Sequence, residues 1–227
     1  MLRPKKHITR QKIKEDKFVS ETLKTAEWIK NNQSKLTAGA IVLLIAGVVF
    51  WGYISARQAA EREASLLTLQ GGYALEFGDL DQARDLLVGA AERFGSVPSA
   101  RRATLMLGHL FFRQGAIDTA RTYYQLYLDK YSKGGILRAS SMAGVAACME
   151  QSGSHTEAAE MYEKAAKEKK GGAKSAHYLL QAGRAYRLAG QIQQAMVVYE
   201  RLKFEYPNVA EADRAALELA QLARQGG

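Results

Sequence analysis

The sequence predicts an all-α protein with one N-terminal transmembrane helix, followed by an α-solenoid of about four helical hairpins and a capping helix. Three observations predict this architecture. Residues 36–56 form one uncharged apolar run, a pattern of glycines and alanines recurs four times between residues 71 and 195, and the chain has only 3 prolines in 227 residues. Alanine, leucine, glutamate and arginine dominate after residue 57, and no alternating strand pattern is present.

The apolar run at residues 36–56 is long enough to cross a membrane. Its 21 residues, at ~1.5 Å each, form a helix of about 32 Å, against a hydrocarbon core of about 30 Å. Phe50, Trp51 and Tyr53 are aromatic residues typical of the membrane interface. A cleaved signal peptide has a shorter basic head and a shorter apolar run, and a helix buried in a soluble core is the remaining alternative. We therefore expect an uncleaved transmembrane helix.

Basic side chains gather before the apolar run. Residues 1–35 hold ten lysines and arginines, whereas the twenty residues after the run hold only Arg57 and Arg62. Because flanks rich in Lys and Arg stay in the cytoplasm, we expect a cytoplasmic N-terminus and, in a bacterium, a C-terminal domain on the periplasmic side of the inner membrane. This segment supplies most of the net charge of +9. Attraction to anionic lipid head groups explains that charge, and no motif points to nucleic acid.

Four parts are expected along the chain. Residues 1–35 form the basic cytoplasmic segment, which contains either an amphipathic helix on the membrane surface or a partly ordered tail. Residues 36–56 span the membrane, and residues 57–63 continue as a helical linker because no breaker interrupts them. Residues 64–225 form the repeat domain, which ends in a capping helix at residues 208–225.

A period of 37 or 38 residues runs through the C-terminal domain. In each unit a glycine is preceded, seven positions earlier, by a tiny residue and followed, five positions later, by an alanine. Nine positions after the glycine stands a large residue, Leu87, Tyr124, Tyr162 or Tyr199. The repeat-packing positions are Gly71, Gly78, Ala83, Gly108, Gly115, Ala120, Gly153, Ala158, Gly183, Gly190 and Ala195.

This spacing is that of a helix–turn–helix unit. The glycine can adopt a positive φ and end the first helix, and the small residues let two helices approach closely while the large residue fills the gap between layers. One hairpin cannot bury its own apolar face, whereas a stack of hairpins can. We expect a β-branched residue at Gly115 or Gly190 to clash with a close helix contact and to require a costly backbone angle.

The units resemble tetratricopeptide repeats. The fourth unit matches that pattern best, through Gly183, Tyr186, Gly190, Ala195, Tyr199 and Pro207. The resemblance covers about residues 64–207, with a few residues more per unit than the usual repeat of about 34. It implies a concave groove, lined by the first helix of each hairpin, that binds protein or peptide partners.

The register of the first helices predicts which residues face this groove. They are Arg102, Leu105, His109, Phe112, Arg113, Glu150, His177, Leu180, Arg184 and Arg187, together with Thr68 and Glu76 of the first unit. Basic side chains interleaved with apolar ones suit a peptide of acidic or C-terminal character. The alternative is that these are ordinary exposed helix residues. The Lys/Asn set with which some family members clamp a terminal carboxylate is absent.

The layout around the apolar run is similar to that of the single-anchor tetratricopeptide proteins known as ancillary SecYEG translocon subunits. The similar part, about residues 27–57, contains Trp28, Asn31, Asn32 and Lys35, then the apolar run and an aromatic-rich exit. This resemblance implies that the outer domain associates with the translocon and with periplasmic chaperones, and so assists protein export. A structural adaptor for envelope assembly or cell division is the alternative function.

No catalytic or cofactor-binding constellation is visible in the sequence. The four histidines are widely separated, and the single cysteine, Cys148, lies in an apolar stretch that indicates burial. Residues 170–175 lack the glycine spacing of a phosphate-binding loop, and the lysines around them form a solvated loop or a patch for an acidic partner. We expect a binding protein with no cofactor, no small-molecule substrate and no enzymatic activity.

Overall fold

The chain is described by a computed structural model. The described residues are 10–95, 97–131, 134–168 and 173–225. Part of the predicted basic segment and most of the predicted lysine-rich loop therefore lie outside the described residues.

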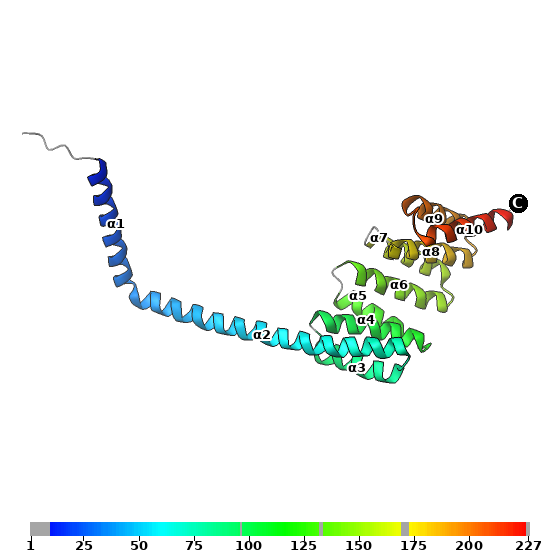
Figure 1. The fold of residues 1–227 in the computed structure, drawn as a ribbon, viewed down its shortest axis with the longest axis horizontal. Coiled ribbons are helices and arrows are strands. Elements are labelled where there is room, and N and C mark those ends of the chain that lie inside the picture. The colour runs from blue at the N-terminus through cyan, green and yellow to red at the C-terminus, as the bar shows by residue number, and fades with distance from the viewer. Residues whose placement is uncertain (1–9, 96, 132–133, 169–172, 226–227) are drawn as a thin grey trace, which may run out of the picture. The chain divides into compact units, whose positions relative to one another are not determined.

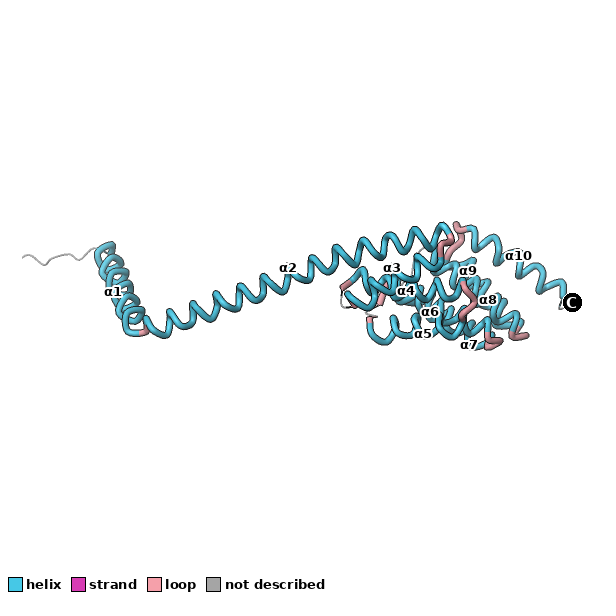
Figure 2. Tube along the Cα trace, turned by 90° about the horizontal axis from the view of Figure 1, so that it is seen from below, coloured by secondary structure: helices cyan, strands magenta, loops and turns pink. Residues whose placement is uncertain are grey.

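All regular secondary structure in these described ranges is α-helical (Figures 1 and 2). The helices are α1 (Arg10–Asn31), α2 (Gln33–Phe77), α3 (Leu80–Arg93), α4 (Pro98–Arg113), α5 (Ile117–Lys130), α6 (Ile136–Gln151), α7 (His155–Glu168), α8 (Ala173–Leu188), α9 (Ile192–Glu205) and α10 (Ala210–Gln225). The predicted all-α class, with a solenoid of helical hairpins, is confirmed.

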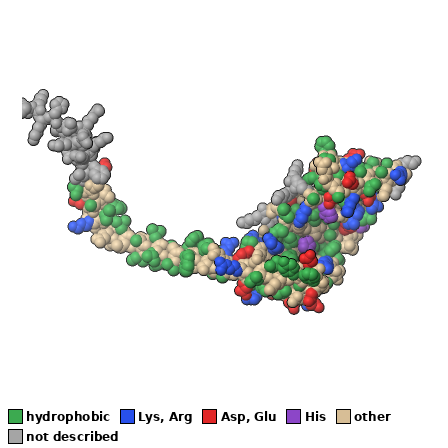
Figure 3. Space-filling model, in the orientation of Figure 1, with side chains coloured by type: hydrophobic (Ala, Val, Ile, Leu, Met, Phe, Trp, Pro, Cys, Tyr) green, Lys and Arg blue, Asp and Glu red, His purple; other side chains and the backbone are tan. Residues whose placement is uncertain are grey.

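The chain divides into two compact units, Met1–Arg57 and Gln58–Gly227. The first contains α1 and the beginning of α2. Helix α2 carries the one segment, among the described residues, that is long and apolar enough to cross a membrane by length and composition, and none of that segment is buried. Large side chains such as Leu43 and Trp51 are exposed along it (green in Figure 3). Exposed apolar side chains along this segment are compatible with a membrane-spanning helix.

The second unit begins inside α2, which is helical without interruption through the predicted linker at residues 57–63. Ala64 is buried there against Ala100 of α4. The carboxylate of Glu61 accepts hydrogen bonds from the Ser99 backbone N–H, at 3.1 Å, and from its hydroxyl, at 2.7 Å. It supplies an acceptor and a negative charge to the start of α4, which has no side-chain cap of its own. The first hairpin is thereby fixed to the second.

Each hairpin turn is a helix end closed by a glycine. Gly78, Gly115, Gly153 and Gly190 have φ values of +87°, +76°, +82° and +74°. The backbone N–H that follows each glycine donates, at 2.9 Å, to the carbonyl oxygen five residues before it, which is the Schellman arrangement. The predicted turns are confirmed. The predicted clash at Gly115 and Gly190 is wrong, because nothing lies within 4 Å of an added Cβ, and only the backbone angle opposes a side chain there.

The small residues of the first helices lie directly against the large residues of the second helices. An added Cβ on Gly108 would lie 2.6 Å from the Tyr124 ring. One on Gly183 would lie 2.4 Å from the Tyr199 ring. An added Cβ on Gly71 would lie 2.7 Å from the Leu87 side chain. The alanines of the pattern, Ala83, Ala120, Ala158 and Ala195, are completely buried.

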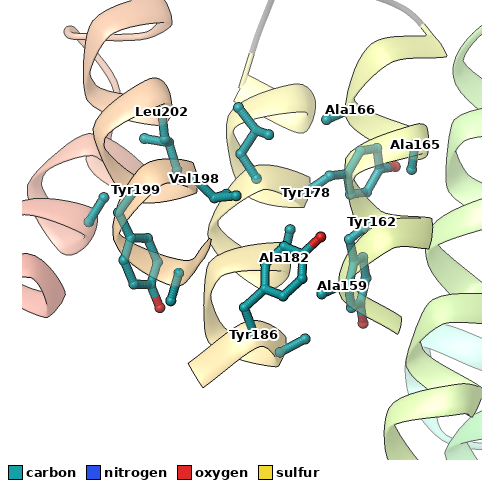
Figure 4. Packing of buried hydrophobic residues seen from close by; sticks show 14 of the residues in the cluster. Ala159, Tyr162, Ala165, Ala166, Tyr178, Ala182, Tyr186, Val198, Tyr199 and Leu202 are labelled. Atoms are coloured by element: carbon teal, nitrogen blue, oxygen red, sulfur yellow. The ribbon is translucent and has the colours of Figure 1, made fainter. Parts of the chain in front are cut away.

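Helix α10 covers the C-terminal end of the solenoid. It packs on both α8 and α9. Its Ala212, Ala215 and Leu222 are buried in the same cluster as Tyr199 and Leu202, which Figure 4 shows between neighbouring helices. The predicted capping helix is therefore present.

Candidate protein-binding groove

The first helices of the second, third and fourth hairpins, α4, α6 and α8, line a groove with a volume of about 420 Å³. Its lining residues are His109, Phe112, Tyr124, Ser140, Ala143, Gly144, Ala147, Glu150, Gln151, Tyr162, His177, Tyr178, Gln181 and Arg184. In Figure 3 the solenoid carries histidine side chains (purple) among hydrophobic and charged ones. The groove therefore combines apolar, uncharged polar and charged groups.

Small residues of the middle helix, α6, give the groove its depth. Ala143, Gly144 and Ala147 offer no side chain beyond Cβ. An added Cβ on Gly144 would lie 2.5 Å from the ring of Tyr124, which already meets Gly108 from the other side. These two glycines let the Tyr124 ring pass between α4 and α6, so that a residue of the second-helix row, α5, also lines the groove.

Tyr124 and His109 form one polar contact of the groove wall. The Tyr124 hydroxyl lies 2.8 Å from His109 Nδ1, and the two rings meet edge to face with centroids 5.3 Å apart. Although His109 as a whole residue is exposed, desolvation by the surrounding protein lowers the pKa of its imidazole, and the charge of Lys174 lowers it further. Burial raises the pKa of the Tyr124 phenol. Both rings are therefore uncharged at neutral pH.

An ion pair crosses the groove from α6 to α8. One guanidinium nitrogen of Arg184 donates to both carboxylate oxygens of Glu150, at 2.8 and 3.0 Å. The Glu150 side chain is mostly buried, whereas that of Arg184 is half-exposed. The pair links two hairpins and balances the positive charge of Arg184 inside the groove.

Amides, hydroxyls and an imidazole complete the wall on α8. Tyr178 Oη lies 3.2 Å from the Ser140 hydroxyl, and Gln181 Nε2 lies 3.5 Å from His177 Nε2. The side-chain oxygen of Gln181 is buried and accepts no hydrogen bond from the part of the chain that the structure describes. Because buried acceptors normally have a donor, this oxygen is an unsatisfied acceptor of the groove wall.

Five of the residues predicted to face the groove line it. They are His109, Phe112, Glu150, His177 and Arg184. The other predicted residues of the second to fourth hairpins, Arg102, Leu105, Arg113, Leu180 and Arg187, do not.

The prediction is wrong for Leu105 because α6 packs on α4 where Leu105 lies. Leu105 is buried in a cluster with Tyr124 and Val145, so only the C-terminal half of α4 is open to the groove. Leu180 likewise packs against the C-terminal core cluster. Thr68 of the first hairpin is also buried, and its hydroxyl donates to the Ser99 carbonyl at 3.1 Å.

Two of the predicted arginines outside the groove are held by the chain itself. Arg113 donates to the backbone carbonyl of Leu75. Arg187 pairs with Glu218 of the capping helix at 3.4 Å. The groove is therefore less basic than the count of arginines on the first helices predicts, because its remaining arginine, Arg184, also has a carboxylate partner.

Sequence reasoning missed the tyrosines and the small residues of the groove. Tyr124 and Tyr162 were expected only as fillers between layers, and Tyr178 was not singled out. Gly144 is the one glycine inside α6, and a glycine in a helix interior is the signal that could mark a close approach to a neighbouring ring.

Comparisons with known proteins agree with this architecture. Residues 68–134 and 178–208 match family models described as tetratricopeptide repeat. Each of these two segments is thus similar to tetratricopeptide repeats. Such repeats stack into scaffolds for protein–protein interaction. The residues that line the groove come from the first matched segment, from residues 140–177 between the segments and from the start of the second segment. Comparison with curated protein sequences gives no match.

Solved structures share the fold. BtubC (BKLC) from P. vanneervenii has a TM-score of 0.63 at 18% identity, over 77% of this chain and 83% of that one. A tetratricopeptide repeat protein from Parabacteroides merdae has a TM-score of 0.58 at 17% identity, over 72% of this chain and 61% of that one. Pseudomonas aeruginosa pilF has a TM-score of 0.52 at 20% identity, over 69% of this chain and 67% of that one. At these identities the likeness shows the fold alone.

No group of three or more metal-ligating side chains occurs among the residues that the structure describes. Cys148 is completely buried in the solenoid. Burial raises the pKa of its thiol to about 11, with opposing contributions from Arg121 and Asp118. The thiol therefore stays protonated and acts as a small packing residue.

Proposed function

We propose that the chain is a membrane-anchored scaffold whose α4–α6–α8 groove binds an extended segment of a partner protein outside the cytoplasm. The observation that carries the proposal is the groove itself: a shallow channel across three hairpins, with small residues along its middle and donors and acceptors on both sides. Its volume of about 420 Å³ falls in the range of about 300–1,000 Å³ that is typical of ligand sites.

An extended backbone fits this arrangement best. Ala143, Gly144 and Ala147 let a chain approach α6 closely, because they carry no long side chain. The unused Gln181 oxygen is an acceptor for a peptide N–H, and His177 and Gln151 add polar contacts beside it. Phe112 provides an apolar surface at the α4 side. These groups recognise peptide bonds and one apolar side chain.

The charge balance defines the expected partner segment. Glu150 pairs with Arg184, and the pKa of His109 is lowered, so among the described residues the groove lining holds no unpaired lysine, arginine, aspartate or glutamate. We therefore propose an uncharged segment as its preferred occupant. An acidic segment would have to displace Glu150 from Arg184 and leave a mostly buried carboxylate without its partner, which is unfavourable.

The anchor and the orientation follow from the sequence at residues 36–56 and its basic flank. The segment is apolar, long enough to span and wholly exposed in the chain's own fold. With the basic flank in the cytoplasm, the repeat domain faces the other side of the membrane. The layout similar to ancillary SecYEG translocon subunits supports a role beside the export machinery, with translocon components or periplasmic chaperones as partners.

Photo-crosslinking tests the groove. A photoreactive residue placed at Phe112 or at His177, in the full chain in native membranes, is expected to give protein adducts. The same residue at Val197, which is exposed on α9 and absent from the groove lining, is the control. Equal yields at all three positions would overturn the proposal. Adducts with translocon or chaperone components would support the export role, and adducts with cell-wall or outer-membrane factors would favour an envelope-assembly adaptor instead.

Protease protection tests the topology separately. In sealed inner-membrane vesicles with the cytoplasmic face outward, we expect added protease to remove the basic N-terminal segment and to leave the repeat domain intact. Degradation of the repeat domain in vesicles whose lumenal marker stays protected would show the opposite orientation.

A further inference from the structure

One apolar surface of the solenoid is not covered. Leu66, Leu69, Tyr73 and Phe77 lie along the outer face of α2 and are 60%, 55%, 54% and 85% exposed. The opposite face of the same helix is buried through Ala64, Thr68, Gly71 and Ala74. We call the four exposed residues the α2 stripe. It lies at the N-terminal end of the stack, beyond α3 and α4.

The repeat register shows that two of these positions, those of Leu66 and Tyr73, are interior in the other hairpins. Leu66 and Tyr73 stand twelve and five positions before the turn glycine Gly78. Their counterparts in the other hairpins are Ala103, Ser141 and Tyr178, and Leu110, Cys148 and Ala185. These six residues are 0–8% exposed, because the second helix of the preceding hairpin covers them. Helix α2 has no preceding hairpin, so the stripe is the face that a further helix would cover.

The stripe differs from an interior face in shape. Interior positions are mostly small, and they accept a closely packed helix, as Gly144 accepts Tyr124. The stripe is built of four large side chains. Leu66, Leu69 and Tyr73 are spaced by three and four residues, which is the spacing of a coiled-coil seam, where side chains of one helix interlock with those of another. The stripe therefore fits a helix that lies alongside α2.

We propose that a second copy of this chain covers the stripe, with the two α2 helices side by side. The stripe is apolar along its length and so complements itself. It begins ten residues after the proposed span ends and belongs to the same uninterrupted helix. Two copies anchored with the same topology therefore carry identical stripes at the same number of residues from their spans. The parallel orientation of the two α2 helices rests on the membrane topology proposed above. The pairing of the two stripes does not depend on that topology.

Charges bound the contact. Arg62 lies one turn before Leu66, Glu76 lies between Tyr73 and Phe77, and both are exposed. In a parallel pair each of these charged residues lies opposite the same residue of the second copy. The repulsion between like charges opposes contact there, but only weakly, because the charges are in water. The apolar contact is thus confined to Leu66–Phe77, about three turns of helix. Such a short seam makes a weak dimer in dilute solution, and tethering in one membrane raises the effective concentration that sustains it.

Cysteine crosslinking in membranes tests the proposal. Leu69→Cys and Tyr73→Cys are introduced one at a time into the full chain, whose native Cys148 is completely buried. Val197→Cys, at a position 62% exposed on α9, is the matched control. Under mild oxidation we expect disulfide-linked dimers from the stripe positions at a yield at least about tenfold above the control, since effective concentration governs the yield. Equal yields, or adducts of Leu69→Cys with a different protein, would overturn the proposal.

A second variant separates the interface from the fold. Leu66→Glu in the Tyr73→Cys background is expected to lower the dimer yield to that of the control, while the melting temperature stays unchanged because Leu66 is exposed in the single chain. An unchanged dimer yield would refute the pairing. Photo-crosslinking from Phe112 in the same Leu66→Glu variant reports on the groove alone, so failure of groove binding and failure of stripe pairing give different results.

Discussion

At the C-terminal end of the solenoid, α10 buries Ala212, Ala215 and Leu222 over the last hairpin, whereas at the N-terminal end α2 leaves Leu66 and Tyr73 in solvent. A stack of hairpins must end somewhere, and each end presents an apolar face that in the interior is covered by the next layer. This chain covers one end with its own helix. The other end is formed by the helix that also carries the membrane-spanning candidate.

The two terminal helices show this difference in their sequences. Helix α10 places alanines toward the core and charged residues such as Asp213, Arg214 and Arg224 toward solvent. Helix α2 has large apolar residues on its outer face. A capping helix needs a polar outer surface, which α10 has. The apolar outer surface of α2 is instead typical of a helix that contacts another one.

Removing the cap should have the largest effect on stability. Truncation of the full chain after Asn208, studied in detergent, is expected to lower the free energy of unfolding by more than about 3 kcal/mol, since burial of a single leucine contributes about 1.5–3 kcal/mol and the truncation also exposes the Tyr199 side of α9. Thermal melting followed by circular dichroism measures it. Leu217→Gln, at an exposed position of α10, is the control and should leave the melting temperature unchanged. A truncated chain that melts like the full chain would show that α10 is not a cap.

Two tyrosines compare the ends directly. Tyr199 is completely buried near α10, whereas Tyr73 is half-exposed on the α2 stripe. Tyr199→Ala is expected to cost about 3–5 kcal/mol through the cavity it leaves, and Tyr73→Ala less than about 1 kcal/mol in detergent-solubilised single chains. Guanidinium denaturation of the full chain measures both. Similar losses for the two variants would mean that the N-terminal face is covered within the chain after all.

The sequence predicted what is local to a hairpin. The turn glycines, the Gly108–Tyr124 and Gly183–Tyr199 contacts and the buried alanines all follow from residues within one repeat, and the fourfold period repeats the same local rule. The capping helix was predictable as well, because its apolar positions lie on one face.

What the sequence did not predict depends on how successive hairpins turn against one another. Leu105 was placed in the groove by register, but the twist of the stack brings α6 over it. The charge of Arg184 was counted as free, but its partner Glu150 lies 34 residues earlier on another hairpin. Such partners depend on the angle and distance between hairpins, which the repeat period leaves open. A visible signal was that both Leu66 and Tyr73 are large, whereas each of the other three hairpins has at least one small residue at the corresponding two positions.

Alanine substitutions of the packing glycines compare the stability of the interior with that of the N-terminal layer, with smaller expected losses. Gly183→Ala forces the Tyr199 ring, 2.4 Å from the new Cβ, to move inside a closed core, and should cost about 1–3 kcal/mol. Gly71→Ala meets Leu87, 2.7 Å away, in the end layer. A flexible aliphatic side chain next to an uncovered layer can adjust, so we expect less than half of that loss. Melting temperatures of the two variants measure the difference.

A matched control for these glycines is Gly190→Ala. Nothing lies within 4 Å of its Cβ, so its φ of +74° is the only source of cost, about 1–2 kcal/mol. If Gly71→Ala destabilised the chain as much as Gly183→Ala, the N-terminal layer would be as rigid as the interior.

The smallest expected effect concerns the pH dependence of the covered end. Burial raises the pKa of Tyr199 to about 12, and burial together with a hydrogen bond to Glu163 raises that of Tyr186 to about 12. In the unfolded chain both phenols ionise near pH 10. The folded state therefore holds more protons between about pH 10 and 12, so stability falls as the pH rises through that window.

Replacing each tyrosine by phenylalanine should flatten this alkaline loss, with different consequences at neutral pH. Tyr186 Oη donates to Glu163 at 3.0 Å, so Tyr186→Phe should cost about 0.5–1.5 kcal/mol at pH 7. The Tyr199 hydroxyl is buried near Arg187 but makes no hydrogen bond of normal geometry within the described part of the chain. Tyr199→Phe should therefore be neutral or slightly stabilising at pH 7. Urea denaturation at pH 7 and pH 10.5 measures both variants, and an equal loss for the two at pH 7 would mean that the Tyr199 hydroxyl has a partner when α10 closes the stack.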